Sequence, residues 1–169
     1  MQFSRVAARL ALFAVAFGLM VAVLWMFTPF GRPVLASTAD AKDPWTAADV
    51  VQAADLAREI AEKKPTSLTV LYVGFRPLFN GGHIPGAVFH GAGSTEAGIA
   101  ELKKWAATLP KSTKLVIYCG CCPFGICPNV GPAFSALREM GFSHLRVLAL
   151  PDNFNEDWIE KGYPTEKGS

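Results

Sequence analysis

The sequence predicts an α/β domain with a central, mainly parallel sheet and helices on both of its faces. Apolar runs of strand length occur at 68–73, 115–118 and 145–150. They alternate with segments at 95–108 and 131–140, whose apolar residues recur at helical spacing. Strands that alternate with helices are typical of parallel sheets, because each parallel connection needs a crossover. The run at 115–118 is apolar and β-branched, which indicates a buried strand.

Composition limits the domain count and the class of partner. The chain has 169 residues, 51% of them hydrophobic, which supports one domain once the N-terminal segment is set aside. The net charge is +2, and lysine and arginine form no dense patch, so no nucleic-acid partner is expected. The three histidines are scattered, and none is spaced with the cysteines as in a zinc finger.

Residues 1–36 predict a membrane anchor or a signal peptide, and both alternatives stay open. An uncharged apolar helix is expected at 10–27, after Arg5 and Arg9. Its length lies between that of a signal-peptide core and that of a membrane-spanning helix. Because the positive flank stays inside, we expect the domain to be membrane-anchored or exported and to face the periplasm or the cell exterior. Neighbouring cysteines form disulfides there unless they are kept reduced.

The remaining elements follow from local signals. Residues 37–45 predict a polar linker, and the domain is expected over 46–166. A helix is expected over 46–63, with Thr46 as its N-cap. Further segments are assigned from turn residues and short apolar runs: a loop over 75–82, a turn over 84–87, a short strand at 88–89 and a closing helix over 155–161.

All four cysteines lie within nine residues, on a loop between the strand at 115–118 and the helix at 131–140. Loops at this place in α/β folds bring free backbone N–H groups and the positive end of a helix together. Such a field favours a thiolate and makes a cysteine a nucleophile or a ligand. We therefore expect the chemistry at this loop and the lowest thiol pKa at its first cysteine. The four are Cys119, Cys121, Cys122 and Cys127.

Two segments, in this order along the chain, resemble rhodanese-like domains over roughly residues 46–166. The first is Gly-His-Ile-Pro-Gly-Ala at 82–87. The second begins with the strand that ends in Tyr118 and Cys119 and continues through a loop and a helix. It then contains Met-Gly-Phe at 140–142, Asp-Trp at 157–158 and Lys-Gly-Tyr-Pro at 161–164.

The resemblance implies a small rhodanese-like domain of three layers around a mainly parallel sheet. It also implies that Cys119 is the catalytic residue of a sulfurtransferase. In the family, this cysteine takes a sulfane sulfur from a donor, holds it as a persulfide and passes it to a thiophilic acceptor. No cofactor is then required, and the partners are a sulfur donor and a thiol acceptor.

The loop departs from the family pattern in two ways. It is longer than usual, and it contains no Arg, Lys or His, so thiosulfate is expected to be a poor donor. Where the family usually has an Asp and an Arg, this chain has Tyr72 and Gly74, and Arg76 is the candidate contact for a substrate anion. Apart from the thiols, the residues expected in the active-site loop are Gly120, Pro123, Phe124, Gly125, Ile126, Pro128 and Asn129.

The other three cysteines allow three interpretations. Cys122 and Cys127 could form a disulfide that pins the loop. Cys121 could act as a resolving thiol for a persulfide or sulfenate on Cys119. All four thiolates could surround one Cu or Zn ion. The alternative functions are thiol–disulfide exchange, soft-metal handling, or a non-catalytic interaction domain on the same fold.

Overall fold

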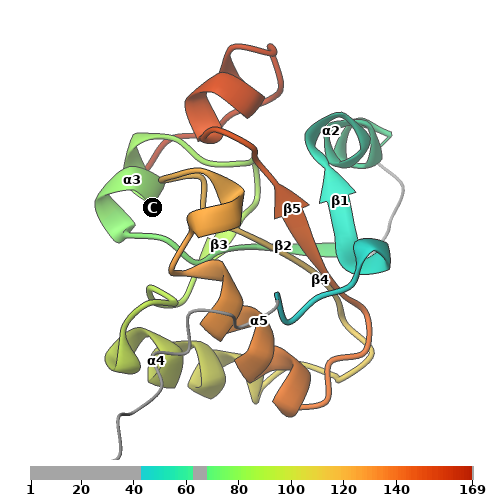
Figure 1. The fold of residues 1–169 in the computed structure, drawn as a ribbon, viewed down its shortest axis with the longest axis vertical. Coiled ribbons are helices and arrows are strands. Elements are labelled where there is room, and N and C mark those ends of the chain that lie inside the picture. The colour runs from blue at the N-terminus through green and yellow to red at the C-terminus, as the bar shows by residue number, and fades with distance from the viewer. Residues whose placement is uncertain (1–42, 63–67, 169) are drawn as a thin grey trace, which may run out of the picture. The chain divides into compact units, whose positions relative to one another are not determined.

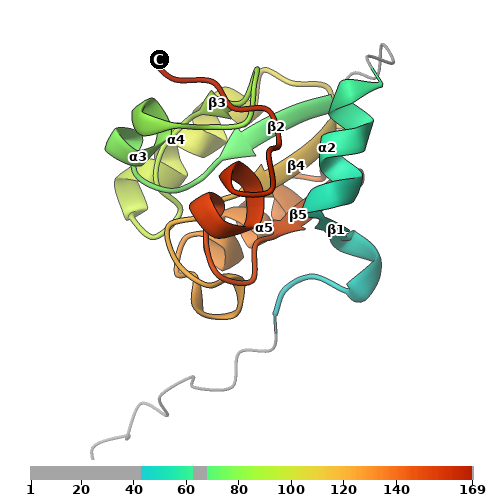
Figure 2. The same cartoon turned by 90° about the horizontal axis from the view of Figure 1, so that it is seen from above.

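The computed structural model describes residues 43–62 and 68–168, which form three layers (Figure 1). A five-stranded sheet with the order β1-β5-β4-β2-β3 lies in the middle, and all of its strand pairs are parallel. Helices cover both faces of this sheet (Figure 2). The predicted α/β class and parallel sheet are therefore confirmed. The predicted N-terminal hydrophobic helix lies outside the described residues.

The elements alternate along the chain as the sequence predicts. The strands are β1 (Val50–Gln52), β2 (Leu68–Tyr72), β3 (Val88–Phe89), β4 (Lys114–Tyr118) and β5 (Leu145–Ala149). The α-helices are α2 (Ala53–Ala61), α3 (Arg76–Gly81), α4 (Glu96–Ala106) and α5 (Val130–Glu139). Three single turns of helix complete the fold: η2 (Ala47–Asp49), η3 (Phe124–Ile126) and the π-helical turn η4 (Asn155–Ile159).

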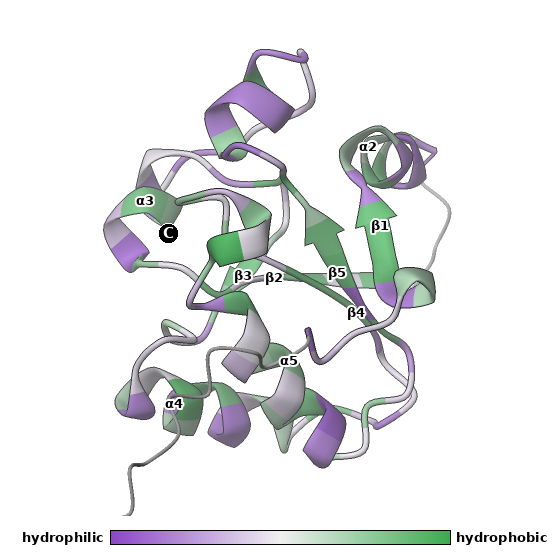
Figure 3. Cartoon of the chain, viewed as in Figure 1, coloured by the Kyte–Doolittle hydropathy of each residue, from purple (hydrophilic) through white to green (hydrophobic). Residues whose placement is uncertain are grey.

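The central strand β4 divides the core into two clusters. Val116 and Tyr118 point to the face covered by α2, α3 and η4. Leu115 and Ile117 point to the face covered by α4 and α5. All four residues are fully buried, because neighbouring strands and both helical layers cover β4. Figure 3 shows the apolar colouring of the strands and the polar outer faces of the helices.

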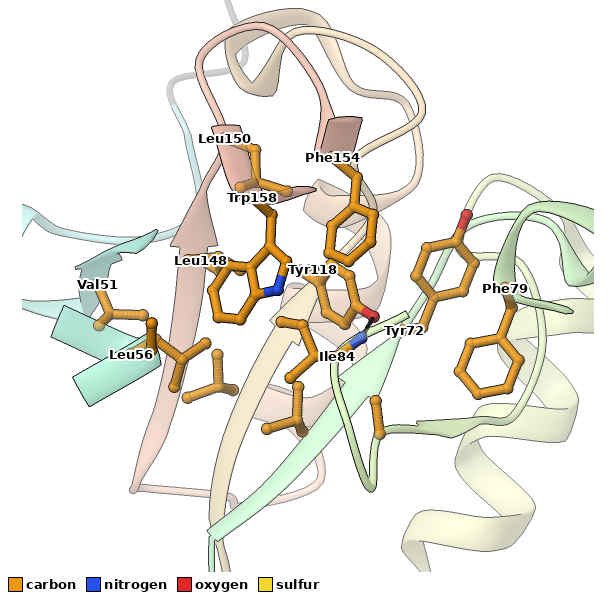
Figure 4. Close-up of a cluster of buried hydrophobic side chains, with 14 residues drawn as sticks. Val51, Leu56, Tyr72, Phe79, Ile84, Tyr118, Leu148, Leu150, Phe154 and Trp158 are labelled. Carbon is orange, nitrogen blue, oxygen red and sulfur yellow. Dashed lines mark hydrogen bonds between the residues drawn. The ribbon is translucent and has the colours of Figure 1, made fainter. Parts of the chain in front are cut away.

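The turn at 84–87 is fixed to β4 by one hydrogen bond. The backbone N–H of Ile84 donates to the hydroxyl of Tyr118 at 3.0 Å (Figure 4). Tyr118 packs against Phe154, which in turn stacks on Trp158 of η4. The turn, the end of β4 and the segment after β5 are therefore parts of one core.

Two predicted elements are wrong. The helix expected over 46–63 starts only at Ala53, because Val50–Gln52 pairs with β5 as an edge strand. Thr46 instead caps the single turn η2, in a reciprocal capping arrangement with Asp49. The loop expected over 75–82 contains helix α3, which has a proline in its first turn, where proline is well tolerated.

No helix among the described residues is long and apolar enough to cross a membrane. The predicted anchor or signal peptide at 1–36 lies outside the described residues. Trp45, expected in the linker, packs on Phe124 and Phe134 with ring centroids 5.1 and 5.6 Å apart, respectively. This contact holds the start of the described chain against the cysteine loop.

Candidate active site

Cys119 directly follows β4 at the carboxyl edge of the parallel sheet, where α/β folds place their binding sites. The chain turns away at Gly120, whose φ of +74° favours glycine. A Cβ at this position would lie 2.6 Å from Cβ of Phe154. The carbonyl of Gly120 accepts a hydrogen bond of 2.9 Å from the backbone N–H of Phe154. The nucleophile predicted from the sequence is therefore held on a rigid turn.

The long loop after Gly120 folds back over the end of β5. The backbone N–H of Phe124 donates to the carbonyl of Leu150 at 3.0 Å. Of the predicted loop residues, Phe124 contacts the core, and Asn129 is buried beside the thiols. Four others are exposed to solvent, and these are Pro123, Gly125, Ile126 and Pro128.

The structure brings the cysteines together in one cluster of free thiols. The Sγ atoms of Cys119 and Cys121 are 3.0 Å apart, and those of Cys121 and Cys122 are 3.4 Å apart. The Sγ atoms of Cys119, Cys121 and Cys127 all lie within 4.8 Å of one another. Cys122 and Cys127, for which a disulfide was one of three interpretations, are both free thiols in this structure. Three sulfur atoms from both ends of the loop are close enough to share a proton, a sulfur atom or a metal ion.

Asn129 connects this cluster to the loop before α4. Its side-chain Nδ2 donates to Sγ of Cys119 at 3.5 Å and to Sγ of Cys121 at 3.7 Å. Its Oδ1 accepts the backbone N–H of Ser94 at 3.0 Å, which fixes the orientation of the amide. The backbone at Gly93 lies so close that a Cβ there would be 1.9 Å from the Asn129 carbonyl oxygen. Asn129 therefore presents hydrogen-bond donors to two sulfur atoms.

The protonation of the cluster differs from the prediction. The pKa of Cys127 is lowered to about 5, first because the Cys119 thiol donates a hydrogen bond to it. Burial opposes this shift, whereas the backbone N–H groups of Asn129 and Val130, at the start of α5, and the Cys122 thiol donate to Cys127 and lower its pKa further. The same thiol–thiolate hydrogen bond, and then burial, raise the pKa of Cys119 above its ordinary value. Burial and the neighbouring thiols raise the pKa of Cys122 to about 12.

The expectation that Cys119 has the lowest pKa of the four thiols is therefore wrong. The main reason is that the Cys119 thiol donates a hydrogen bond to Cys127, at the far end of the loop, and the first amides of α5 also donate to Cys127. Cys119 and Cys127 share one proton, so they titrate as a pair.

A pocket of about 360 Å³ opens next to Cys119 and Cys121. Half-exposed Leu78 and Ile159 lie at its rim, and Asn153 and Asn155 are among its polar residues. Among the residues that the structure describes, no Lys, Arg or His lines this pocket. The space beside the thiols is therefore mainly apolar and carries no positive side chain.

Arg76, the predicted contact for a substrate anion, does not line the pocket beside the thiols. Its guanidinium is 4.4 Å from the ring centroid of Phe89. It lines a different pocket, together with His83 and Glu166. Arg76 is the first residue of α3, which occupies the segment that was expected to be a loop, and the pocket beside the thiols is lined by Pro77 and Leu78 of this helix instead.

The sequence did not identify Tyr72 as a site residue. Tyr72 ends β2 in register with Tyr118, and the two rings pack edge to face (Figure 4). Tyr72 also lines the pocket next to Cys119. Burial, and then the neighbouring Cys119 and Cys121, raise the pKa of Tyr72 above its ordinary value, so the phenol stays neutral. A Cβ at Gly74 would lie 2.3 Å from the Tyr72 hydroxyl and 2.9 Å from Sγ of Cys119. The available signal was the position of Tyr72 at a strand end.

Comparisons with known proteins agree with this architecture. No protein-family model matches the chain, and no curated protein matches it. The solution structure of a rhodanese-like domain from an Anabaena sp. protein is 28% identical, with a TM-score of 0.53, and the match covers 70% of this chain and 79% of that one. A crystal structure from the same Anabaena protein is 25% identical, with a TM-score of 0.53 and coverages of 70% and 92%.

A thiosulfate sulfurtransferase from Pseudomonas aeruginosa also has a similar fold. It is 23% identical, with a TM-score of 0.50. The match covers 75% of this chain but 20% of that protein. At this identity the similarity is one of fold.

Proposed function

We propose that this chain, whose described residues form a rhodanese-like domain, is a sulfurtransferase that carries sulfane sulfur as a persulfide on Cys119. One observation supports this most strongly. Sγ of Cys119 lies at the carboxyl end of β4, beside a pocket, and accepts a hydrogen bond from Asn129. A sulfur atom in this position can be reached by a donor and is stabilised when it carries negative charge.

The first half-reaction charges the enzyme. Sγ of Cys119 attacks the outer sulfur of a donor persulfide, and its proton moves to the Cys127 thiolate, to which it is already hydrogen-bonded. The bond between Cys119 and the sulfane sulfur forms, and the bond between that sulfur and the donor breaks. The donor leaves as a thiolate with the bonding electron pair. Cys127 acts as the general base in a loop that contains no histidine.

The second half-reaction discharges the enzyme. A thiolate acceptor attacks the terminal sulfur of the Cys119 persulfide and takes it, and Cys119 leaves as a thiolate. Two groups stabilise negative charge at Cys119 through both steps: the side-chain amide of Asn129 and the backbone N–H of Cys121. No metal or organic cofactor takes part in either step.

The pocket favours a particular class of donor. Thiosulfate is a dianion, and the residues beside the thiols include no cation that would bind it. The neutral phenol of Tyr72 and the apolar Leu78 and Ile159 suit a thiol-borne persulfide with little charge near its reacting sulfur. We infer that the donor is a thiol-borne persulfide and that the acceptor is a thiol.

The proposal is tested by donor-dependent sulfide or thiocyanate release from the full chain. Cys119→Ser should abolish turnover with every donor, whereas Cys122→Ser should retain it. Cys122 is the matched control, because its Sγ is in the same loop but does not belong to the group of three close sulfur atoms. Full turnover by Cys119→Ser would refute the proposed nucleophile.

A second function, thiol–disulfide exchange, is favoured by one distance. Sγ of Cys121 is 3.0 Å from Sγ of Cys119, and a disulfide bond is about 2.05 Å long. Attack of Cys121 on the inner sulfur of the Cys119 persulfide would release hydrogen sulfide and leave a Cys119–Cys121 disulfide. Two external thiols would then have to reduce this bond, and they would leave as a disulfide. Sulfide release without acceptor, together with a loss of two thiols per turnover, would identify this route.

We also propose that the domain works outside the cytoplasm, on the basis of Arg5 and Arg9 before the apolar segment. An alkaline phosphatase fused to the C-terminus should be active in cells. A fusion that is inactive, while a cytoplasmic reporter at the same position is active, would contradict this orientation.

A further inference from the structure

We propose that Cys119, Cys121 and Cys127 also form a binding site for one Cu(I) ion. Their Sγ atoms lie within 4.8 Å of one another. Cys119 is buried, at 2% exposure, and the other two are half-buried, so the sulfur atoms converge below the surface of the loop. Sulfur transfer uses one of these sulfurs as nucleophile and one as base, and it gives no reason for three to converge.

The spacing of the sulfurs fits a metal ion. A thiolate sulfur lies about 2.3 Å from a bound d¹⁰ ion, so three sulfurs around one ion in a plane are about 4 Å apart. The present separations range from 3.0 Å, between Cys119 and Cys121, up to the 4.8 Å limit. Occupancy requires Sγ of Cys121 to move about 1 Å away from Cys119, a small rotation for a half-buried side chain.

The donor set selects a soft ion with few ligands. Thiolates select Cu(I) or Zn(II) over hard cations. Structural zinc takes four ligands, but among the described residues the group contains three cysteines and no histidine or carboxylate. Cys122 is 3.4 Å from Cys121, yet it is not close to all three sulfurs. Three thiolates satisfy Cu(I), and we therefore assign this ion.

The surrounding donors support the same ligand set. Three thiolates around one Cu(I) carry a net charge of −2, which requires hydrogen bonds to the sulfurs. Asn129 donates from its side chain to Cys119 and to Cys121. The backbone N–H groups of Asn129 and Val130 donate to Cys127. Every proposed ligand therefore accepts a hydrogen bond, as second-shell groups provide in metal sites.

Copper binding is separate from sulfur transfer but uses the same nucleophile. A Cys119 thiolate that is bonded to Cu(I) cannot attack a donor, so copper should inhibit turnover and a persulfide on Cys119 should block copper. The two proposals fail independently. Copper can bind to a protein that has no transferase activity, and transfer can occur in a protein that binds no copper.

The test is a Cu(I) titration of the full chain, reduced and kept under anaerobic conditions, against the chromogenic chelator bicinchoninate. We expect one Cu(I) per chain. Cys119→Ser, Cys121→Ser and Cys127→Ser should each weaken binding by about 100-fold or more, because changes in the second shell alone cost about 10–100-fold. Cys122→Ser should bind as the wild type does. Circular dichroism of each variant controls for folding.

X-ray absorption at the copper edge gives a second readout that needs no variant. The wild-type protein should show three sulfur ligands and no nitrogen or oxygen ligand. Failure of the protein to compete with bicinchoninate for Cu(I) would overturn the proposal. A fourth sulfur ligand, together with equal loss of binding in Cys122→Ser, would overturn it as well. A Zn(II) titration that depends equally on all four cysteines would also overturn it.

Discussion

The side-chain amide of Asn129 donates a hydrogen bond to Sγ of Cys119 at a distance of 3.5 Å. The two residues come from opposite ends of the cysteine loop. Asn129 is fully buried, and the backbone N–H of Ser94 fixes its other amide atom. In a loop with no cationic side chain, this amide takes the place of a positive charge beside the nucleophile.

Replacement of Asn129 should therefore reduce sulfur transfer without unfolding the protein. Asn129→Asp keeps the acceptor for Ser94 but replaces the donor with a carboxylate beside two sulfurs. We expect kcat/KM for a thiol persulfide to fall by about 100-fold or more, the scale of a lost donor to a developing charge. Asn129→Ala should be less impaired than Asn129→Asp, because it adds no negative charge. Wild-type activity of Asn129→Asp would show that the amide has no part in catalysis.

Tyr118→Phe should destabilise the domain, because it leaves the buried N–H of Ile84 without its acceptor. Loss of a partner for a buried donor costs about 1–3 kcal/mol. The measurement is the free energy of unfolding from urea denaturation. Tyr163→Phe is the matched control, because Tyr163 is only half-buried against Trp158, and its loss should cost less than about 0.5 kcal/mol. If Tyr118→Phe were as stable as the wild type, the hydrogen bond between Ile84 and Tyr118 would not stabilise the 84–87 turn.

Gly120→Ala should destabilise the turn that presents Cys119. The left-handed φ of +74° and the close contact with Phe154 both oppose a side chain. We expect a loss of about 2 kcal/mol or more in the free energy of unfolding. Gly125→Ala is the control, because a Cβ there would have no neighbour within 4 Å. If the two variants unfold at the same urea concentration, the turn is not under this constraint.

A positive charge at the pocket rim should improve the use of thiosulfate. Leu78 lines the pocket and is 52% exposed, so Leu78→Lys adds a cation without burying it. We expect kcat/KM for thiosulfate to rise by about 10-fold, while that for a neutral persulfide changes little. Leu78→Met is the uncharged control. If Leu78→Lys and Leu78→Met had the same kcat/KM for thiosulfate, the lack of a cation beside the thiols would not determine the choice of donor.

The fold and the position of Cys119 at the end of β4 could be predicted from local signals, because the alternation of elements and the end of this strand are encoded in short segments. The three-residue strand β1 could not, since its pairing with β5 is a contact between distant parts of the chain. Tyr72 is at the site only because β2 pairs with β4 in register. The low thiol pKa belongs to Cys127 and not to Cys119 for a similar reason. The path of the loop decides which of these two cysteines meets the first amides of α5.

Asn129 shows the same limit within the site itself. Its position in the cysteine loop marked it as a site residue, but its function depends on Ser94, which lies outside that loop. Arg76, the predicted contact for a substrate anion, lies at the start of a helix that was not expected, and its guanidinium packs on the ring of Phe89. Closeness in sequence to Cys119 therefore indicates a residue near the thiols within the cysteine loop. It does not do so for the segment that contains Arg76.

The most direct test of the proposed function is mass spectrometry of the full chain after reaction with a thiol persulfide donor and removal of excess donor. We predict that the peptide containing Cys119 gains the mass of one sulfur atom and loses it when a thiol acceptor is added. Cys119→Ser should gain none, and Cys122→Ser should gain as much as the wild type. Sulfur found on Cys121, Cys122 or Cys127 instead, and retained in Cys119→Ser, would contradict the assignment of Cys119 as the sulfur carrier.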